Sequence, residues 1–224
     1  MPAAPALLLH EERWLGTPRP NDRSVPTLVL LHGYGSSERD LVMVLPALAM
    51  FLPEVSARVL AIRGGHPVPG RRGHGWFPGP LMAQPPLADI GRTGDQIADI
   101  VRRFTTRAVL LGFSQGMCAA ITVMRRHPDL VRGLVGLSGY LYDDTHPGDA
   151  QLAVMSMSGH GIPAFVGYDP ADPRVPAVAI RHAVEFLRTH AALEERTYPG
   201  LGHSLSMPEI SDAARFLRRV LRAA

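Results

Sequence analysis

The sequence predicts an α/β fold in which a mainly parallel central sheet carries helices on both faces. Short apolar runs of strand length alternate with amphipathic segments of helix length along most of the chain, which is the order that builds parallel strands joined by helices. The composition, with 46% hydrophobic and 19% charged residues over 224, fits a globular protein. Because neither an internal repeat nor a composition break divides the chain, we expect a single domain over residues 1–224.

Local signals predict the individual elements. Each expected strand is a short apolar run bounded by turn-forming residues, as Thr27–Leu31 is by Pro26 and Gly33. Each expected helix has apolar residues at helical spacing, as Thr93–Phe104 does. The expected strands cover 6–15 (an antiparallel edge strand within an N-terminal segment 1–26), 27–31, 57–62, 107–111, 134–137, 163–166 and 194–198. The expected helices run from Asp40, which caps the first, to about Phe51, and over 93–104, 115–126, 177–190 and 211–222.

Charge and cysteine content exclude several kinds of partner. The net charge is +3 and the isoelectric point is near 9.5, but every basic side chain is a scattered arginine, so we expect no nucleic-acid partner. Cys118 stands alone, which excludes a disulfide framework and a zinc–thiolate cluster. No apolar run reaches the roughly 18 residues that span a bilayer. Met1–Leu9 lacks a basic region and a cleavage site, so we expect a cytoplasmic protein without stable membrane insertion.

The segment Gly112-Phe113-Ser114-Gln115-Gly116 carries the clearest chemical signal. It is a G-x-S-x-G pattern placed where a predicted buried strand becomes a helix. At such a turn the serine adopts strained backbone geometry with its hydroxyl above the sheet, and the two glycines allow strand and helix to pass closely. The helix N-terminus favours negative charge beside the hydroxyl. The pattern therefore predicts that Ser114 is a catalytic nucleophile.

A serine nucleophile needs a base, and in this strand–turn–helix context the acid and then the histidine follow the serine in chain order. Three histidines lie late enough in the chain, namely His182, His190 and His203. The first two fall within the predicted helix 177–190, whereas His203 lies in a glycine-rich loop after a predicted strand. Loops at the carboxyl ends of strands carry catalytic residues, so His203 is the predicted base.

The acid is expected to follow the predicted strand 163–166. Asp169 and Asp172 both do so, and spacing alone does not separate them. Asp143 and Asp144, one strand earlier, are weaker candidates because some hydrolases carry the acid there. An aspartate beside prolines also serves as a turn former.

An oxyanion hole needs two backbone N–H donors aimed at the tetrahedral oxygen. One is expected from the amide of Gln115, directly after the nucleophile. The other is expected from the Tyr34 amide in His32-Gly33-Tyr34-Gly35, which follows the predicted strand 27–31.

Together these motifs resemble the phospholipase/carboxylesterase family of α/β-hydrolases. The resemblance runs from about Thr27 to the C-terminus and implies the α/β-hydrolase fold and a serine esterase or thioesterase that needs no metal and no organic cofactor. It also implies Asp172 as the acid, because Asp172 stands three residues before Val175-Pro176 as the family's aspartate does. The motifs that carry it are Leu31-His32-Gly33-Tyr34-Gly35, Arg39-Asp40-Leu41, Gly75-Trp76-Phe77, Gly112-Phe113-Ser114-Gln115-Gly116, Asp172-Pro173-Arg174-Val175-Pro176 and Gly202-His203-Ser204.

Two positions depart from the family pattern. Tyr168-Asp169 replaces the family's His-Gly and places a second carboxylate near the expected triad, where it could alter the pH profile. Met117 replaces the second glycine often found after the serine turn. Neither change removes a catalytic group, but both bear on substrate preference.

The Gly- and Pro-rich stretch 63–86 is expected to lie over the active site, because loops of this length are usually functional. We expect Trp76, Phe77, Leu81 and Met82 within it to wall an apolar acyl pocket, with simple hydrophobic anchoring an equally good interpretation of each residue.

The expected substrate is a small-molecule ester or thioester with a short to medium acyl chain, turned over by a monomer or homodimer. Two alternatives are another chemistry on the same fold, such as a perhydrolase or a dienelactone hydrolase, and a non-catalytic scaffold. Dienelactone hydrolases use cysteine where Ser114 stands, and complete triad candidates count against a scaffold.

Overall fold

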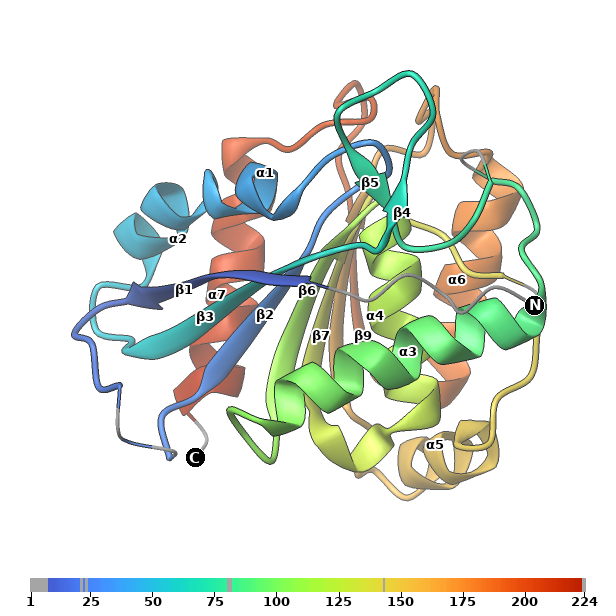
Figure 1. The fold of residues 1–224 in the computed structure, drawn as a ribbon. Coiled ribbons are helices and arrows are strands. Elements are labelled where there is room, and N and C mark those ends of the chain that lie inside the picture. The colour runs from blue at the N-terminus through green and yellow to red at the C-terminus, as the bar shows by residue number, and fades with distance from the viewer. Residues whose placement is uncertain (1–7, 21, 23, 80–81, 143, 223–224) are drawn as a thin grey trace.

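A computed structural model of the chain describes residues 8–20, 22, 24–79, 82–142 and 144–222. It contains a seven-stranded sheet in the order β1-β3-β2-β6-β7-β8-β9 (Figure 1). β1 runs antiparallel to β3 at one edge, and the other neighbours are parallel. The strands are β1 (Leu8–Leu15), β2 (Thr27–Leu31), β3 (Ala57–Arg63), β6 (Ala108–Phe113), β7 (Val131–Leu137), β8 (Pro163–Tyr168) and β9 (Ala192–Thr197), with a small hairpin of β4 (His66–Pro67) and β5 (His74–Gly75).

Helices cover both faces of the sheet, as the sequence predicted. One face packs against α3, α4 and α6, and the other against α1, α2 and α7 (Figure 1). Residues of one strand alternate between the two cores, with Val29 and Leu31 in the first and Leu28 and Leu30 in the second. The helices are α1 (Glu38–Val42), α2 (Leu45–Phe51), α3 (Leu87–Arg102), α4 (Gln115–Arg126), α5 (Asp149–Met157), α6 (Ala177–His190) and α7 (Met207–Arg222), with a 3-10 turn over Pro128–Leu130.

The predicted helix from Asp40 to Phe51 is wrong in its start and its continuity. Ser37 caps the helix, accepting the amide of Arg39, and Asp40 lies inside α1. The segment then divides into α1 and α2 at Met43 and Val44. The break follows from Pro46, which has no amide hydrogen and fits only the first turn of a new helix.

Other boundaries moved because tertiary packing outweighed local propensity. α3 begins at Leu87, six residues before the predicted start at Thr93, and includes Gly91 and Gly94. A Cβ on Gly94 would lie 2.9 Å from the Thr122 side chain, so this glycine allows α3 to pack closely on α4. α5 was not predicted, because its apolar residues are not confined to one side and Leu152 alone among them is buried.

The carboxyl ends of the parallel strands lie on the same side of the sheet, and the loops that follow β2, β6, β8 and β9 meet there. The β4–β5 hairpin also lies on this side (Figure 1). Hydrogen bonds tie it to the loop after β2, since the Gly35 amide donates to the His74 carbonyl at 2.9 Å and the His74 amide donates to the Ser36 carbonyl at 2.8 Å.

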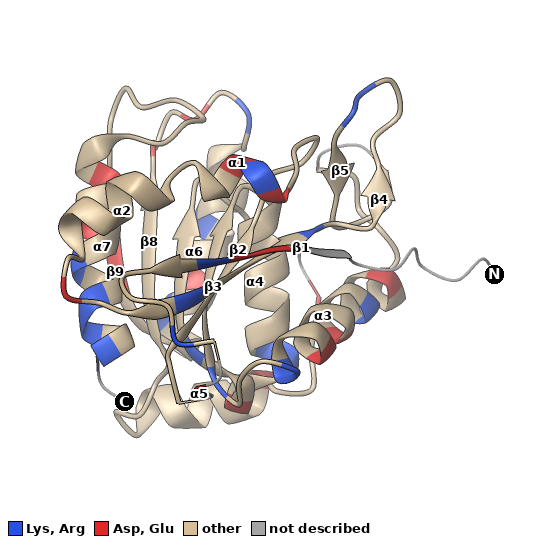
Figure 2. Ribbon diagram, turned by 60° about the vertical axis from the view of Figure 1, so that its left-hand side comes forward, with Lys and Arg blue, Asp and Glu red and all other residues tan. Residues whose placement is uncertain are grey.

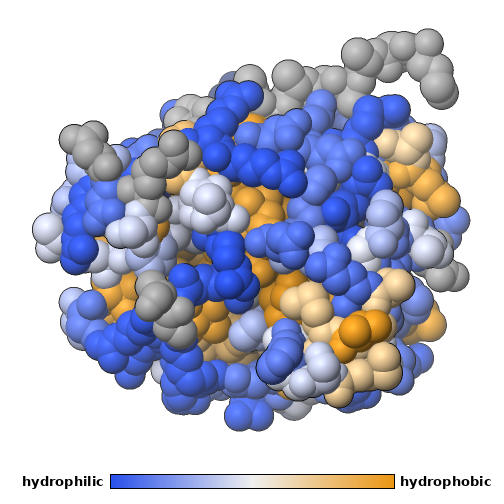
Figure 3. Space-filling view, turned by 90° about the horizontal axis from the view of Figure 1, so that it is seen from below, coloured by the Kyte–Doolittle hydropathy of each residue, from blue (hydrophilic) through white to orange (hydrophobic). Residues whose placement is uncertain are grey.

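The face seen from below in Figure 3 is mainly hydrophilic, with apolar side chains interspersed. Two of the exposed apolar residues, Val154 and Met157, belong to α5.

Within the part of the chain that the structure describes, none of the helices combines the length and apolar character needed to cross a bilayer.

Candidate active site

Ser114 lies at the sharp turn between β6 and α4. Its backbone has φ +55° and ψ −120°, an unusual conformation for a non-glycine residue, and its amide donates to the Leu137 carbonyl at 2.9 Å. The side chain is almost fully buried, with 2% of its residue surface exposed. This geometry agrees with the strained nucleophile turn expected from the sequence.

The glycines on either side of Ser114 have no room for a side chain. A Cβ on Gly112 would collide with the backbone of Gly116, and a Cβ on Gly116 would collide with the Leu31 carbonyl. Strand, helix and the neighbouring β2 therefore approach too closely for any other residue at these two positions. That close approach fixes the serine in its turn.

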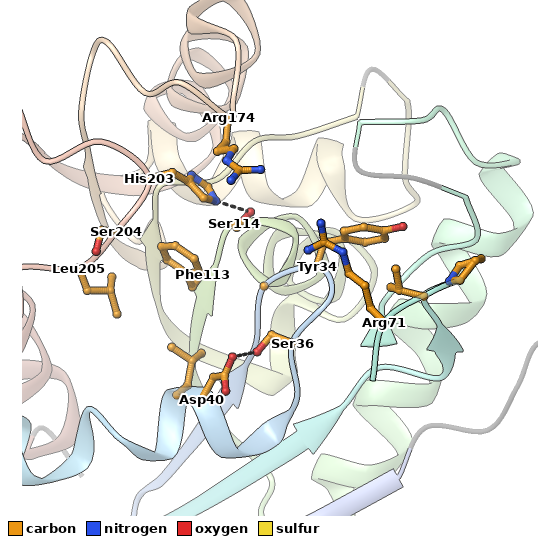
Figure 4. Close-up of a pocket in the computed structure, with 14 residues that line it drawn as sticks. Tyr34, Ser36, Asp40, Arg71, Phe113, Ser114, Arg174, His203, Ser204 and Leu205 are labelled. Atoms are coloured by element: carbon orange, nitrogen blue, oxygen red, sulfur yellow. Dashed lines mark hydrogen bonds between the residues drawn. The ribbon is translucent and has the colours of Figure 1, made fainter. Parts of the chain in front are cut away.

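Ser114, His203 and Asp172 form one chain of hydrogen bonds. The Oγ of Ser114 lies 3.0 Å from Nε2 of His203 (Figure 4). Nδ1 of His203 lies 2.7 Å from Oδ2 of Asp172. The other oxygen of Asp172 accepts the amides of Arg174 at 2.7 Å and Val175 at 3.0 Å. The Asp172 side chain is fully buried, whereas that of His203 is 16% exposed. The histidine thus joins a buried carboxylate to a hydroxyl at the floor of a pocket.

The other carboxylates considered as the acid lie elsewhere. Asp169 accepts the amides of Ala171 at 2.9 Å and Gly202 at 2.7 Å, and these backbone hydrogen bonds lower the pKa of its carboxyl below the usual range. It therefore holds the histidine loop through Gly202. Asp144 is bonded to Arg125 and His146, and Asp143 lies outside the described residues. His182 and His190 lie on α6, as the sequence indicated.

The loop after β2 lies directly against the nucleophile. A Cβ on Gly33 would lie 3.0 Å from the Phe113 ring and 3.5 Å from Cβ of Ser114. Gly33, Tyr34 and Ser114 line the same pocket. Tyr34 and Gln115 therefore both lie close to Ser114, and the oxyanion role of their amides stays a prediction.

A buried histidine holds this loop in place. Burial lowers the pKa of His32 to about 4, so the ring is neutral near pH 7. Its Nε2 accepts the Gly64 amide at 3.0 Å, so the proton is on Nδ1 and is donated to the Gly33 carbonyl at 2.8 Å. The Trp76 indole donates to the His32 carbonyl at 2.7 Å, and the Gln115 side chain accepts the Trp76 amide at 2.8 Å. These contacts connect the loops after β2 and β3 to the serine turn.

The pocket at Ser114 has a volume of about 800 Å³ and is open to solvent. The Phe113 ring packs beside His203 with centroids 4.9 Å apart. Apolar lining comes from Leu41, Val68 and Leu205. A second hollow of about 440 Å³ adjoins it and shares Tyr34, Val68 and Pro69 with it.

Of the four residues expected to wall the acyl pocket, the three that the structure describes do not line the pocket at Ser114. Trp76 is fully buried in the core and braces His32, while Phe77 lines the adjoining hollow of about 440 Å³. Met82 lines a separate hollow beside Val178 on α6. Leu81 lies outside the described residues.

Sequence reasoning missed several residues that line the pocket. Val68 and Arg71 belong to the stretch 63–86 that was expected over the active site, but no local pattern singled them out within it. Leu205 reaches the pocket from a loop whose position depends on long-range packing. Arg174 lies two residues after Asp172 in the motif Asp172-Pro173-Arg174-Val175-Pro176. Its closeness to the expected acid was the sequence signal that could have predicted it as a pocket residue. Among the described residues, no group of three or more His, Cys, Asp or Glu is arranged to hold a metal ion.

A family model described as phospholipase/carboxylesterase matches residues 89–221, more than half of the chain. One relative is acyl-protein thioesterase 1 of Mycosarcoma maydis, which is 27% identical over 241 residues that cover 92% of this chain and 95% of that protein.

Solved structures share the fold at low sequence identity. The carboxylesterase of Bacillus cereus superimposes with a TM-score of 0.71 at 19% identity and covers 94% of each chain. A carboxylesterase from Mesorhizobium loti gives a TM-score of 0.66 at 21% identity, covering 91% of this chain and 90% of that one. These likenesses confirm the predicted fold class.

Proposed function

The chain belongs to the phospholipase/carboxylesterase family, and we propose that it hydrolyses short- to medium-chain acyl esters and thioesters with Ser114 as the nucleophile. The observation that carries the residue assignment is the continuous hydrogen-bond chain from Ser114 Oγ through His203 to the buried Asp172 carboxylate, with distances of 3.0 and 2.7 Å. A base within hydrogen-bond reach of the hydroxyl, itself oriented by a third group, is the arrangement that activates a serine.

In the first half-reaction, Nε2 of His203 removes the Ser114 proton while Oγ attacks the acyl carbonyl carbon. Asp172 accepts the Nδ1–H, fixes the ring tautomer and stabilises the imidazolium that forms. The two backbone amides that bond Asp172 keep its carboxylate in position for this role. The amides of Tyr34 and Gln115 hold the oxyanion, and the N-terminus of α4 favours the same negative charge.

The tetrahedral intermediate then collapses. Its bond to the leaving oxygen or sulfur breaks, His203 gives that atom the proton, and an acyl-enzyme on Ser114 remains. In the second half-reaction His203 takes a proton from water, the hydroxide attacks the acyl carbon, and Ser114 is released with its proton restored as the carboxylic acid leaves. The steps balance without a metal or an organic cofactor.

The acyl chain is proposed to run from Ser114 past Val68 and Pro69 into the adjoining hollow beside Phe77. The two hollows share Tyr34, Val68 and Pro69, which supports a continuous path. A series of 4-nitrophenyl esters tests chain length, and rates are expected to fall for acyl chains beyond about twelve carbons, because apolar pockets discriminate by the methylenes they can bury. Rates that rise steadily to longer chains would contradict this proposal.

The remaining assignments are proposals of the same kind. Thioester hydrolysis is supported by the relative named acyl-protein thioesterase. A cytoplasmic location is proposed as well, and fractionation of the producing cells would test it. The protein is proposed to act on small molecules as a monomer or homodimer, which analytical ultracentrifugation would determine.

Intact-mass analysis after incubation with a fluorophosphonate tests the triad directly. The wild type is expected to gain a single adduct, Ser114→Ala none, and His203→Ala and Asp172→Asn much less in the same time. Asp99→Asn is the matched control, because its side chain is 70% exposed on α3 and lies outside the pocket lining. An undiminished adduct on Ser114→Ala, or none on folded wild type, would overturn the assignment.

A further inference from the structure

Two arginines line the pocket at Ser114 from different loops. Arg71 comes from the loop between β4 and β5, and Arg174 follows Asp172 in the loop after β8. In Figure 4 both side chains extend from their loops toward the region around Ser114. Among the residues that the structure describes, no hydrogen bond or ion pair engages either guanidinium. We propose that the substrate is an acidic ester, in which a carboxylate near the scissile carbonyl binds Arg71 or Arg174; this rests on the proposed hydrolase function.

The position of Arg71 is fixed by the hairpin that carries it. The Arg71 amide donates to the Val68 carbonyl at 3.1 Å, and the Val68 amide donates to the Gly73 carbonyl at 3.0 Å, so the loop is a tight turn. Figure 2 shows this basic loop projecting at the end of the hairpin. The side chain lies back over Gly35, where a Cβ would be 3.6 Å from Cδ and 3.7 Å from a guanidinium nitrogen of Arg71. The charge therefore lies beside the loop that carries Tyr34.

Arg174 is held beside the base. Its amide donates to Oδ1 of Asp172 at 2.7 Å, and the other oxygen of the same carboxylate bonds His203. His203 protonates the leaving group in the proposed mechanism, so Arg174 lies on the alcohol side of the scissile bond. Arg71 closely follows Val68 and Pro69, which line both the pocket and the hollow proposed for the acyl chain, so we assign Arg71 to the acyl side.

The remaining charge in the pocket does not cancel the two arginines. Asp40 also lines it, and its carboxylate accepts the Ser36 hydroxyl. Outside the triad, the described lining therefore has two guanidinium groups against one carboxylate. A guanidinium presents a planar fork that matches a carboxylate, and such charge-assisted hydrogen bonds are about twice as strong as neutral ones. A pocket of one predominant sign also raises the local concentration of the opposite charge.

Matched pairs of esters test the inference. On the acyl side, the 4-nitrophenyl monoester of adipic acid is compared with the 4-nitrophenyl ester of adipamic acid, in which a neutral amide replaces the carboxylate. On the alcohol side, 4-acetoxybenzoate is compared with 4-acetoxybenzamide. The kcat/KM of each ester is first divided by the rate constant for hydrolysis of the same ester by hydroxide, which corrects for intrinsic reactivity. The measured quantity is the ratio of this corrected value for the charged ester to that for its neutral partner. At least one ratio is expected to be about ten, the factor for one charge-assisted contact, and to fall as salt is raised.

The variants assign the effect to residues. Arg71→Gln is expected to lower the acyl-side ratio and Arg174→Gln the alcohol-side ratio, each toward one. Arg72→Gln and Arg181→Gln are the controls, since both residues are exposed and outside the pocket lining, and they should leave the ratios unchanged. Equal loss in a control would overturn the inference by showing a general charge effect.

The outcomes separate this inference from the function on which it rests. If neutral esters are hydrolysed in a Ser114-dependent reaction but neither wild-type ratio exceeds one, the hydrolase function stands and the acidic-ester inference fails. A raised ratio that neither Arg71→Gln nor Arg174→Gln lowers also overturns it. If folded wild type hydrolyses none of the four esters, both the function and the inference are overturned.

Discussion

A histidine–aspartate pair from other segments lies near each end of α4, and the two pairs have different surroundings. At the N-terminal end, His203 bonds Asp172 at 2.7 Å, and its second nitrogen meets Ser114 Oγ in an open pocket. At the C-terminal end, His146 bonds Asp144 at 2.8 Å within a buried group that we call the Arg125 cluster. Its members are Arg125, Asp144, His146 and Asp149.

Charges in the Arg125 cluster are neutralised by one another. The Arg125 guanidinium is 2% exposed and bonds the carboxylates of both Asp144 and Asp149, with its carbon 4.6 Å from the centre of the Phe186 ring. Burial alone would raise the pKa of Asp144, but the His146 hydrogen bond and the charges of His146 and Arg125 hold it below its usual range. The cluster fastens the loop before α5 to the end of α4.

We infer from this comparison that a histidine–aspartate pair needs further features to act in catalysis. Nδ1 of His146 is buried without a hydrogen-bond partner among the described residues, so that ring has no proton acceptor or substrate to serve. In the other pair, the nitrogen of His203 that does not bond the aspartate is Nε2, and it faces the Ser114 hydroxyl in the open pocket. We expect that access to substrate and a neighbouring nucleophile distinguish a catalytic pair from a structural one. The following variants test this distinction, from the largest expected effect to the smallest.

His203→Ala and His146→Ala should separate the two pairs most strongly. Removing His203 is expected to lower kcat by ~10⁴-fold or more, because the triad acts as a unit, with little change in melting temperature. Removing His146 should lower the melting temperature and leave kcat close to wild type. Steady-state assays with a 4-nitrophenyl ester and thermal melts measure both. Comparable loss of kcat in the two variants would remove the distinction.

Arg125→Met is expected to destabilise the protein by about 3–5 kcal/mol, because it leaves two carboxylates buried without their cation. Arg126→Met is the matched control. Arg126 pairs with Asp95 nearer the surface, where the two side chains are 25% and 41% exposed, and such pairs contribute about 0–1 kcal/mol. Urea denaturation gives both free energies of unfolding. Equal losses would mean that the Arg125 cluster does not stabilise the fold in the way described.

Glu209, a buried carboxyl at the start of α7, provides a third environment. Burial raises the pKa of its carboxyl from 4.5 to about 7, although a backbone hydrogen bond at Ser206 acts in the opposite direction. The folded state therefore holds a proton that the unfolded state loses between these values. The free energy of unfolding should fall as pH rises from 4.5 to 7, by roughly 3 kcal/mol.

Glu209→Gln should remove this pH dependence. Urea denaturation of wild type and variant across the range from 4.5 to 8 measures it, and subtracting the two curves cancels other groups such as His32. The variant should gain stability relative to wild type as pH rises through 7. A constant difference between the two proteins would contradict the raised pKa of Glu209.

The smallest effect is expected at Cys118, which lies on α4, four residues after Ser114. The thiol is fully buried, and burial raises its pKa far above the ordinary value, so little thiolate forms. Iodoacetamide should leave the native protein unlabelled and its activity unchanged, while the urea-unfolded protein is labelled. Mass spectrometry measures both, and rapid labelling of the native thiol would show that it is accessible.

Local sequence was sufficient for much of the fold. The strand Thr27–Leu31 and the helices Gln115–Arg126 and Ala177–His190 have the predicted bounds. Their signals are apolar runs and helical periodicity that adjacent residues carry. The start of α3 was missed because its glycines are favourable only against α4, and α5 was missed because its apolar residues are not confined to one side.

The sequence by itself determined most of the order of strands and helices along the chain, the serine turn and the histidine loop, because turn chemistry and periodicity are properties of neighbouring residues. It left Asp169 and Asp172 unresolved until a family resemblance favoured the second. Only the tertiary structure brought the Asp172 carboxylate to His203, placed Arg71 and Arg174 in the pocket, and took Trp76 and Met82 away from it. Those contacts join residues distant in the chain, and they depend on the order in which the strands pair and on how the loops pack at the sheet's edge.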